Sequence, residues 1–337
     1  MDKLRVAVIG AGGMGAGHVR TIMDHPRAEL AIACDVNPAA LEPLAAQGIA
    51  TCTDWQDALP GGCGQPQGEV DAAVIILPHH LYPEVVNTAL ARGIHVLKEK
   101  PFARDLDDAR LMREAAEESN AILMVAGQGK YSAGYQRAKQ IVDSGVLGKV
   151  FLSRAIITYR WGGAINNNWS WRGKRELSGG TAVIDSGWHI LDLLTWLHGM
   201  PETVYCTTGQ GNALPGDYDV DDRALLTLEY ADGSIAGVVC CFICLPNARQ
   251  VFLHGTEGSL DITDTCVRLH RGNTSDAEVT QFGPEPDLLA PQFEHFLHLI
   301  ESKTAPVEGA REAYDVQRII DAAYRSAESK RPEGLRE

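Results

Sequence analysis

The feature that most constrains this chain is a glycine-rich loop that directly follows a short apolar run. Residues 4–9 are apolar except for Arg5, the loop Gly10-Ala11-Gly12-Gly13-Met14-Gly15 comes next, and residues 15–23 have helical apolar spacing. A GxGxxG pattern alone is weak evidence, since it can simply mark a turn that needs glycine. Between a buried strand and a helix, however, it is typical of a dinucleotide-binding loop. Backbone N–H groups at the helix start can bind a pyrophosphate, so we expect Gly10, Gly12, Gly13 and Met14 to bind a cofactor.

The first part of the chain alternates between strand and helix patterns. The predicted strands cover residues 4–9, 30–34, 70–77, 94–97 and 122–125. The predicted helices cover residues 15–23, 38–47, 83–92 and 105–119. This alternation predicts an α/β Rossmann domain with a doubly wound parallel sheet over residues 1–126.

The pattern changes after residue 126, where strand-like runs follow one another with tight turns. After a helix over 136–144, the predicted strands cover residues 150–159, 203–208, 224–230, 234–243, 250–254 and 267–270. Helices over 292–302 and 310–329 close the chain. We expect an α+β domain with an open, mostly antiparallel sheet over residues 127–337. Whether the final helix packs back on the first domain stays open.

Composition narrows the class of partner. The formal net charge is −14, so the surface repels nucleic acid and anionic membranes. The start of the chain lacks a signal-peptide pattern and no apolar run is long enough to span a bilayer, which favours the cytoplasm. Cys241 and Cys244 form a CxxC at the end of a predicted strand, where positions three apart face opposite ways. Buried reduced thiols are therefore favoured over a redox or zinc site, and we expect no bound metal.

Asp35 ends the second predicted strand, 25 residues after Gly10. A carboxylate there can accept hydrogen bonds from the adenosine ribose and repel the 2′-phosphate of NADP. Since Val36 and Asn37 supply no cation for that phosphate, NAD is favoured over NADP. The alternative is that Asp35 serves only the turn before the helix that starts at Pro38.

Three further residues are candidates for catalysis. Lys100 follows a predicted strand and precedes Pro101, which restricts its backbone, at the edge of the sheet where ligands bind. On that motif alone, a solvated surface lysine is the better explanation. Asp185 and His189 lie four residues apart in a predicted helix that starts near Val183, with Asp192 on a neighbouring part of the same face. The pair suits a carboxylate that orients a proton-accepting imidazole, and it equally suits a structural pair.

Together and in this order, the glycine loop, Glu99-Lys100-Pro101 and the later Gly179-Gly180 with Asp185 and His189 resemble the Gfo/Idh/MocA family of sugar and cyclitol oxidoreductases. The resemblance implies hydride transfer from a secondary hydroxyl of a sugar or cyclitol such as inositol to NAD. His189 would take the hydroxyl proton, Asp185 would raise its basicity, and Lys100 would stabilise the alkoxide. It also implies a homodimer or homotetramer, and a nicotinamide lying against Leu77, Pro78, His79, Glu99, Lys100 and Gln128.

The chain departs from the family pattern on the substrate side. Tyr82 stands where many members have histidine, and Gly129-Lys130-Tyr131 replaces an arginine–aromatic pair, so the substrate's identity is in doubt. Tyr159, Trp161, Trp169, Trp171 and Arg172 form an aromatic-rich stretch that suits a neutral polyol, or equally an oligomer interface. We expect the substrate to contact Lys100, Tyr131, Trp171, Arg172, Asp185 and His189. Two alternatives remain: a glycoside-cleaving enzyme that oxidises its substrate transiently, and a non-catalytic NAD-binding regulator.

Overall fold

The computed structural model describes residues 3–61, 70–166, 168–211, 217–272, 276–283, 287–303, 305 and 308–337. The chain divides into two compact units. The first unit comprises Met1–Ala103, Asp107–Ala126 and Leu289–Arg311. The second comprises Arg104–Leu106, Gly127–Leu288 and Glu312–Glu337. This division differs from the sequence-based one chiefly in residues 289–311, which belong to the first unit.

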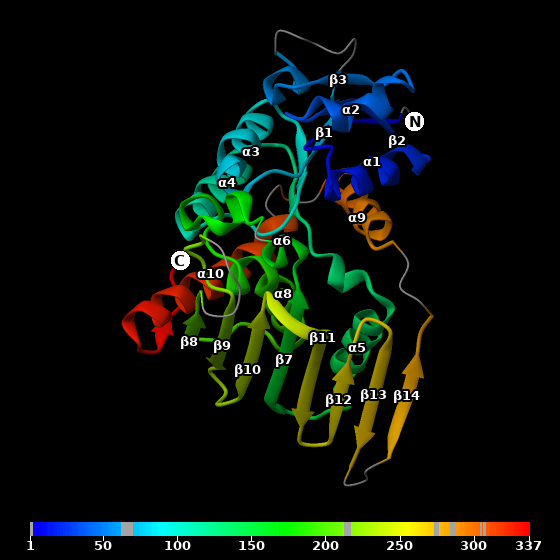
Figure 1. The fold of residues 1–337 in the computed structure, drawn as a ribbon. Coiled ribbons are helices and arrows are strands. Elements are labelled where there is room, and N and C mark those ends of the chain that lie inside the picture. The colour runs from blue at the N-terminus through cyan, green and yellow to red at the C-terminus, as the bar shows by residue number, and fades with distance from the viewer. Residues whose placement is uncertain are drawn as a thin grey trace. The chain divides into compact units, whose positions relative to one another are not determined.

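The first unit contains a six-stranded sheet in the order β3-β2-β1-β4-β5-β6, with every pair parallel. The strands are β1 (Leu4–Ile9), β2 (Ala28–Cys34), β3 (Ala50–Cys52), β4 (Ala72–Ile75), β5 (His95–Lys98) and β6 (Leu123–Val125). The helices between them are α1 (Met14–Asp24), α2 (Pro38–Ala45), α3 (Tyr82–Ala91) and α4 (Leu106–Glu118), in blue to cyan in Figure 1. The prediction of a doubly wound sheet is confirmed. The prediction missed β3, a three-residue edge strand too short for a periodic pattern.

Helix α9 (Leu289–Glu301) belongs to the first unit although it follows the whole second sheet in sequence. Phe293 of α9 is fully buried and meets His25, just after α1, edge-on at 5.3 Å between ring centroids. Glu294 of α9 forms ion pairs with His25 and Arg27. An amphipathic pattern shows that a helix has an apolar face, but not which domain covers that face. The sequence therefore could not assign α9 to its unit.

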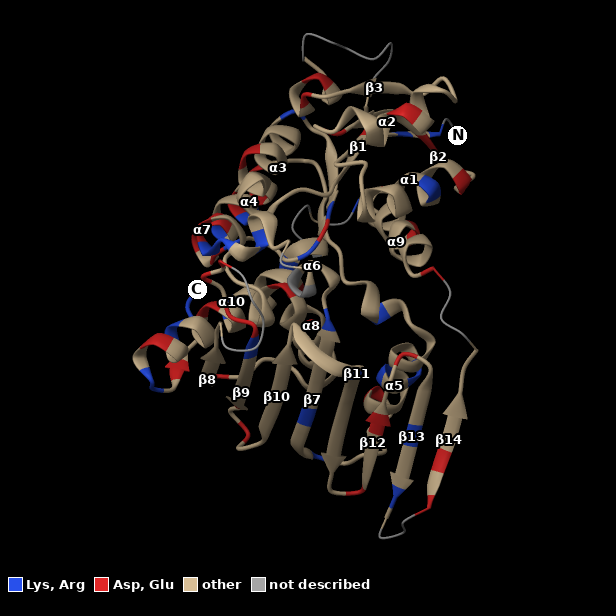
Figure 2. Cartoon of the chain, in the orientation of Figure 1, with Lys and Arg blue, Asp and Glu red and all other residues tan. Residues whose placement is uncertain are grey.

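The second unit contains a nine-stranded sheet in the order β14-β13-β12-β11-β7-β10-β9-β8-β15. The strands are β7 (Val150–Arg160), β8 (Thr203–Gly209), β9 (Arg223–Glu229), β10 (Ile235–Cys241), β11 (Ile243–Gly255), β12 (Gly258–Ile262), β13 (Cys266–Arg271), β14 (Ala277–Gln281) and β15 (Glu333–Gly334). Pairing is antiparallel except between β7 and β10, which confirms a mostly antiparallel sheet. Figure 2 shows β10 in tan along its length, because it contains only apolar residues, glycine and cysteine.

Helices in this unit include α5 (Ala133–Asp143), which contacts β12 and β13, and α8 (Gly187–His198), which contacts β7, β10 and β11. The last helix is α10 (Glu308–Ser329), whose first residues fall in the first unit and which β15 follows. Short helices are α6 (Gly162–Ile165), α7 (Arg175–Ser178), the 3-10 helices η1 (Trp55–Ala58), η2 (His79–Leu81), η3 (Gln128–Tyr131) and η4 (Ser170–Gly173), and a π-helical turn, η5 (Ala182–Ser186). Among the described residues, no helix is long and apolar enough to cross a membrane.

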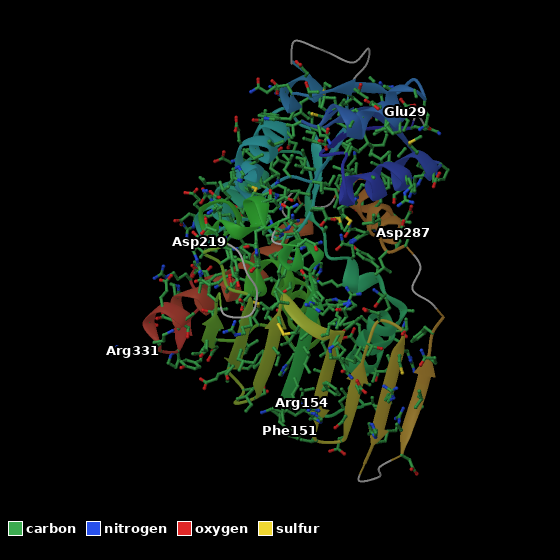
Figure 3. The ribbon with its side chains drawn as sticks, in the orientation of Figure 1. Glu29, Phe151, Arg154, Asp219, Asp287 and Arg331 are labelled. Carbon is green, nitrogen blue, oxygen red and sulfur yellow. A yellow bond between two sulfur atoms is a disulfide. The ribbon has the colours of Figure 1, made fainter. Side chains whose placement is uncertain are left out.

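The expectation of reduced thiols at the CxxC is wrong. Cys241 and Cys244 form a disulfide, with their Cα atoms 5.6 Å apart (Figure 3). The prediction assumed one strand running on towards Cys244, which would point the two side chains to opposite faces. Instead β10 ends at Cys241 and β11 starts at Ile243, on the other side of β7. The chain turns at Phe242, so the two sulfur atoms can meet.

Candidate active site

The glycine loop joins β1 to α1 as predicted. Gly10 has a φ of +96°, and a Cβ atom there would overlap the carbonyl oxygen of Ile76, so only glycine fits. Among the described side chains none caps the start of α1 at Gly13. The first N–H groups of a helix lack intrahelical partners, and here they have no side-chain acceptor. Met14 beside them is 55% exposed. This helix start therefore fits a pyrophosphate group.

Asp35 lies directly beside this loop. One carboxylate oxygen accepts a hydrogen bond from the Gly12 N–H at 2.9 Å, and the other accepts from the Asn37 N–H at 2.9 Å. A Cβ atom on Gly12 would stand 3.3 Å from the same carboxylate oxygen. The Asp35 carboxylate thus stabilises the turn before α2 and also faces the glycine loop. A role in the turn and a role in cofactor binding are therefore compatible.

Lys98, which the sequence did not single out, organises the end of β5. Its ammonium is fully buried and donates to the carbonyl oxygens of Glu99 and Pro101, at 2.6 Å each. It also lies 3.5 Å from the ring centroid of Tyr82. The two carbonyl oxygens belong to the residues on either side of Lys100, so Lys98 fixes the backbone around it. The peptide bond between Lys100 and Pro101 is cis. Burial holds the pKa of Lys98 well below its ordinary value. Tyr82, the departure from the family pattern, therefore supports this buried lysine.

Glu99 is buried beside Lys100 and links β5 to α1. One carboxylate oxygen lies 3.0 Å from Nε2 of His18, and the other accepts from the Lys100 N–H at 3.1 Å. Burial alone would raise the pKa of Glu99, but the hydrogen bond and charge of His18 and the charge of Lys100 lower it overall. His18 falls within the helix predicted over residues 15–23, and the sequence gave no signal that it reaches Glu99.

The other expected cofactor contacts fall in different units. Leu77 and Pro78 are half-buried after β4, and the His79 ring is buried and stacked on Tyr82 at 6.2 Å between centroids. Gln128 begins η3 in the second unit, and Tyr131 ends it. Burial raises the pKa of the Tyr131 hydroxyl.

Lys130, between them, forms ion pairs with Asp192 of α8 at 2.8 Å and with Glu312 of α10 at 2.5 Å. Burial opposes its charge, but Asp192 and Glu312 raise the pKa of Lys130 above its ordinary value. Asp192, which the sequence placed near His189, is therefore paired with Lys130. This ion-paired group ties η3 to both helices within the second unit.

The Asp185–His189 segment differs locally from the predicted helix. Residues 182–186 form the π-helical turn η5, and α8 begins only at Gly187. The Asp185 N–H and the Ser186 N–H both donate to the carbonyl oxygen of Thr181, at 2.9 and 3.1 Å, which widens this turn. Asp185 is therefore in a π turn and His189 in an α-helix, and simple α-helical spacing does not relate them. Such turns often occur at functional sites.

The Asp185 side chain is 5% exposed, and one of its oxygens accepts from Nε of Arg172 at 3.1 Å. Arg172, expected to contact substrate, is thus the partner of the candidate catalytic carboxylate. His189 is half-buried as the third residue of α8. Within the second unit, the Arg172 guanidinium is therefore paired with the buried carboxylate of Asp185, four residues before His189.

A residue that the sequence missed, Asp221, holds this turn in place. Its buried carboxylate accepts from the N–H groups of Thr181 and Val183, at 3.0 and 2.9 Å, and from the Tyr324 hydroxyl at 3.0 Å. Gly180 has a φ of +142°, and a Cβ atom there would overlap the Tyr324 hydroxyl. The close approach of Tyr324 and Asp221 thus explains Gly180, whereas Gly179, with a φ of +80°, lies against the carbonyl oxygen of Arg104. A signal for Asp221 was absent because its partners are 38 or more residues away.

The aromatic residues before η5 form a packed cluster. Trp169, Tyr218, Val220 and Phe242 are buried together, with Tyr159, Trp161 and Ile243 against them. Trp169 stacks on Tyr218 at 4.1 Å between centroids, so this ring belongs to the core. The Arg172 guanidinium lies over the rings of Trp171 at 4.3 Å and Trp161 at 5.6 Å. Burial and the charge of Asp185 hold the pKa of Tyr159 well above its ordinary value.

Comparison with known proteins identifies the family. Residues 4–127 match the oxidoreductase family with an NAD-binding Rossmann fold, and residues 135–261 match the GFO/IDH/MocA C-terminal domain. The chain belongs to the Gfo/Idh/MocA family and is an NAD(P)-dependent oxidoreductase whose first unit carries the NAD-binding Rossmann fold.

Several sugar dehydrogenases are related to it. The chain is 25% identical over 292 residues to levoglucosan dehydrogenase of Pseudarthrobacter phenanthrenivorans, covering 77% of this chain and 73% of that protein. It is 24% identical over 350 residues to D-glucoside 3-dehydrogenase of Escherichia coli, covering 97% and 96%. A solved structure of levoglucosan dehydrogenase with NADH and levoglucosan shares the fold, with a TM-score of 0.90, 21% identity and full coverage of both chains.

Proposed function

We propose that this protein is an NAD-dependent dehydrogenase that oxidises a secondary hydroxyl of a neutral sugar, sugar derivative or cyclitol such as inositol. The observation that carries the proposal is the buried Asp185 carboxylate, paired with Arg172 and four residues before His189, in an NAD-binding family. Relatives named for sugar oxidation support the substrate class.

Bound NAD supplies the hydride acceptor, and the residues of this chain handle the proton and the charge. His189 takes the proton of the reacting hydroxyl, because imidazole is a base suited to neutral pH. Asp185 orients His189 and stabilises its protonated form. Lys100 donates a hydrogen bond to the same oxygen and stabilises the negative charge that develops there. Gly10, Gly12, Gly13, Met14 and Asp35 bind the adenosine and pyrophosphate half of the cofactor, and Leu77, Pro78, His79, Glu99 and Gln128 the nicotinamide half.

The preference for NAD over NADP follows from Asp35. Its carboxylate faces the glycine loop through the hydrogen bond from Gly12, and a negative group there repels a 2′-phosphate. We expect Asp35→Ser to lower NAD affinity and to raise the ratio of NADP to NAD efficiency by about tenfold or more, since charge repulsion is removed. Steady-state kinetics with both cofactors measure this ratio. An unchanged ratio would contradict the role of Asp35.

The substrate side is proposed to comprise Tyr131, Trp171 and Arg172 with the three catalytic residues. Aromatic faces suit the C–H side of a sugar ring, and the Arg172 guanidinium stacked on Trp171 is oriented by Asp185. We further propose a cytoplasmic location and a homodimer or homotetramer. The oligomer is supported by exposed apolar side chains on three neighbouring strands: Tyr205 of β8, Leu225 of β9 and Ile235 of β10. Light scattering of the purified protein tests the oligomeric state.

The test of activity is incubation with NAD and a panel of sugars, glycosides and cyclitols while NADH absorbance is followed. We expect Lys100→Ala and His189→Ala to lower kcat by about 10²- to 10⁴-fold on the best substrate. Lys139→Ala, which removes a helix-surface ion pair with Asp143, is the matched control and should keep full activity. Full activity of both active-site variants would overturn the assigned roles.

The same assay separates the two alternatives. Release of an aglycone without net NADH indicates a glycoside-cleaving enzyme. Binding of NAD without turnover of any compound in the panel indicates a regulator.

A further inference from the structure

The loop closed by the Cys241–Cys244 disulfide contains one aromatic residue, Phe242. Phe242 is 1% exposed and lies where β10 ends and β11 begins. Its N–H donates to the carbonyl oxygen of Asp222 at 2.9 Å, and its carbonyl oxygen accepts from the Trp161 N–H at 3.1 Å. The disulfide therefore closes a short turn, and within it the backbone of Phe242 is hydrogen-bonded to two other segments of the same unit, at Asp222 and Trp161.

The Phe242 ring is a central contact of the aromatic cluster described above. Its centroid lies 5.1 Å from that of Tyr159, 5.2 Å from that of Trp161 and 6.3 Å from that of Trp169. Packed aromatic rings lose contact energy steeply when one of them moves by a fraction of an ångström. The position of Phe242 thus constrains the rings of Tyr159 and Trp161.

These rings lead directly to the candidate catalytic carboxylate. Trp161 lies under the Arg172 guanidinium, and Arg172 donates to Asp185 at 3.1 Å. The charge of Asp185 contributes to the raised pKa of Tyr159. Phe242 is therefore connected to Asp185 through its contact with Trp161 and through Arg172.

We propose that the Cys241–Cys244 disulfide is a positioning element for substrate binding: it fixes Phe242 against Tyr159 and Trp161, and its reduction by a small thiol weakens binding of the sugar. This inference rests on the proposed function, because it assigns the aromatic cluster to the substrate side. Cys241 and Cys244 would then join the residues that set the affinity for the sugar, and their contribution would depend on whether they are oxidised or reduced.

The reduction step needs a thiol reductant and balances as follows. A thiolate of the reductant attacks the sulfur of Cys244, which is half-buried, while Cys241 is nearly fully buried. The Cys241–Cys244 bond breaks, and Cys241 leaves as a thiolate that takes a proton. A second thiol of the reductant then releases Cys244, so the protein gains two electrons and two protons and the reductant becomes a disulfide. A cavity of about 470 Å³ lined by Cys240, Cys241 and Cys244 admits a small thiol to this site.

The local nature of the crosslink predicts a specific kinetic signature. The two cysteines are three residues apart, and a disulfide that closes so short a loop adds less to global stability than one that closes a long loop. Reduction should therefore leave the fold, kcat and NAD affinity nearly unchanged and raise KM for the sugar. We expect an increase of about three- to tenfold in KM, the loss from one displaced aromatic contact.

The experiment compares the purified full-length protein before and after treatment with dithiothreitol, on the best substrate of the panel. Alkylation followed by peptide mass mapping establishes the state of Cys241 and Cys244 in each sample. The double variant Cys241→Ser/Cys244→Ser should show the raised KM and no response to dithiothreitol. Phe242→Leu, with the disulfide intact, should raise KM in the same direction. Cys266→Ala, in β13, should leave KM and its response to dithiothreitol as in the parent protein.

Three results would overturn the inference. One is equal KM in samples whose oxidised and reduced states are verified. Another is a disulfide that is absent after mild oxidation or that dithiothreitol reduces only in denaturant. The last is a parallel loss of kcat, NAD affinity and thermal stability, which indicates general loosening. Failure of the proposed function is distinguishable, because it appears as the absence of sugar turnover in every sample, oxidised or reduced.

Discussion

Two short segments carry the candidate catalytic residues, and they are held in different ways. Residues 98–101 at the end of β5 are held mostly by one another: Lys98 donates to the carbonyl oxygens of Glu99 and Pro101, and Glu99 accepts from the Lys100 N–H. Residues 181–189 are held by distant partners, Asp221 for the backbone of the turn and Arg172 for Asp185.

The difference shows how each segment keeps a polar side chain ordered in a buried setting. A buried ammonium has three N–H groups, and Lys98 directs them at two carbonyl oxygens and the face of Tyr82. The N–H groups of Thr181 and Val183 stand at the start of the helical segment, where they have no partner within the helix, and the Asp221 carboxylate accepts both. We therefore expect changes at the first segment to affect activity more than stability, and changes at the second to affect both.

The largest expected effect is on stability, at Asp221. Asp221→Ala leaves the N–H groups of Thr181 and Val183 and the Tyr324 hydroxyl without their buried acceptor. We expect a loss of about 2–4 kcal/mol in the free energy of unfolding. Urea denaturation followed by circular dichroism measures it. Asp219→Ala, an exposed carboxylate nearby that accepts from the Arg175 N–H, should cost no more than about 1 kcal/mol. Equal losses would remove the distinction between the segments.

The next effect is on activity, at Lys98. Lys98→Met roughly keeps the length of the side chain and removes the hydrogen bonds that hold the carbonyl groups on either side of Lys100. The change relieves the cost of burying a charge but leaves the carbonyl oxygens of Glu99 and Pro101 without their donor, so the free energy of unfolding should fall by no more than about 1–2 kcal/mol. We expect kcat to fall by about 10- to 100-fold, because a small displacement of a catalytic group is costly. An unchanged kcat would show that Pro101 and Glu99 alone position Lys100.

Arg172→Gln tests the charge on the second segment. Removing the guanidinium leaves Asp185 without its ion-pair partner, and the more negative surroundings favour the protonated form of a nearby base. We expect kcat/KM to fall by about three- to tenfold and its acid limb to move to higher pH. The conservative variant Arg172→Lys should restore the position of the acid limb, because it restores the charge. A fall in kcat/KM without any shift of the pH profile would indicate a packing role only.

The smallest effect concerns Glu99. Its pKa is lowered in the folded protein, so it contributes stability at pH values above the ordinary glutamate pKa, and this is lost as the pH falls through the lowered value. His18→Ala removes one hydrogen-bond donor to Glu99 and should cost about 1 kcal/mol near neutral pH. It should also shift acid unfolding to higher pH. His18→Gln, which keeps a donor, should behave more like the parent protein. Identical acid unfolding of the Ala variant and the parent would contradict this contribution.

Much of the first unit was predictable because its signals are local. The apolar run over 4–9, the glycine loop and the alternation of strand and helix fix a parallel sheet, and the structure has it. Lys100 and Asp35 were found because they stand at the ends of strands, where sequence spacing alone places ligand-binding residues. The edge strand β3 and the end of the strand at Cys241 were missed, because a short edge and a turn without glycine or proline leave little periodic pattern.

The sequence by itself determined the family and singled out the candidate cofactor-binding loop and the catalytic candidates, because these depend on residue types at fixed spacing. Only the tertiary structure decided what holds them: Tyr82 under Lys98, His18 on Glu99, Asp221 at the turn before Asp185, and Arg172 on Asp185 itself. It also decided that Cys241 and Cys244 are bonded. The reason is physical: buried polar and charged groups must find partners, and the fold, not proximity in sequence, supplies most of them.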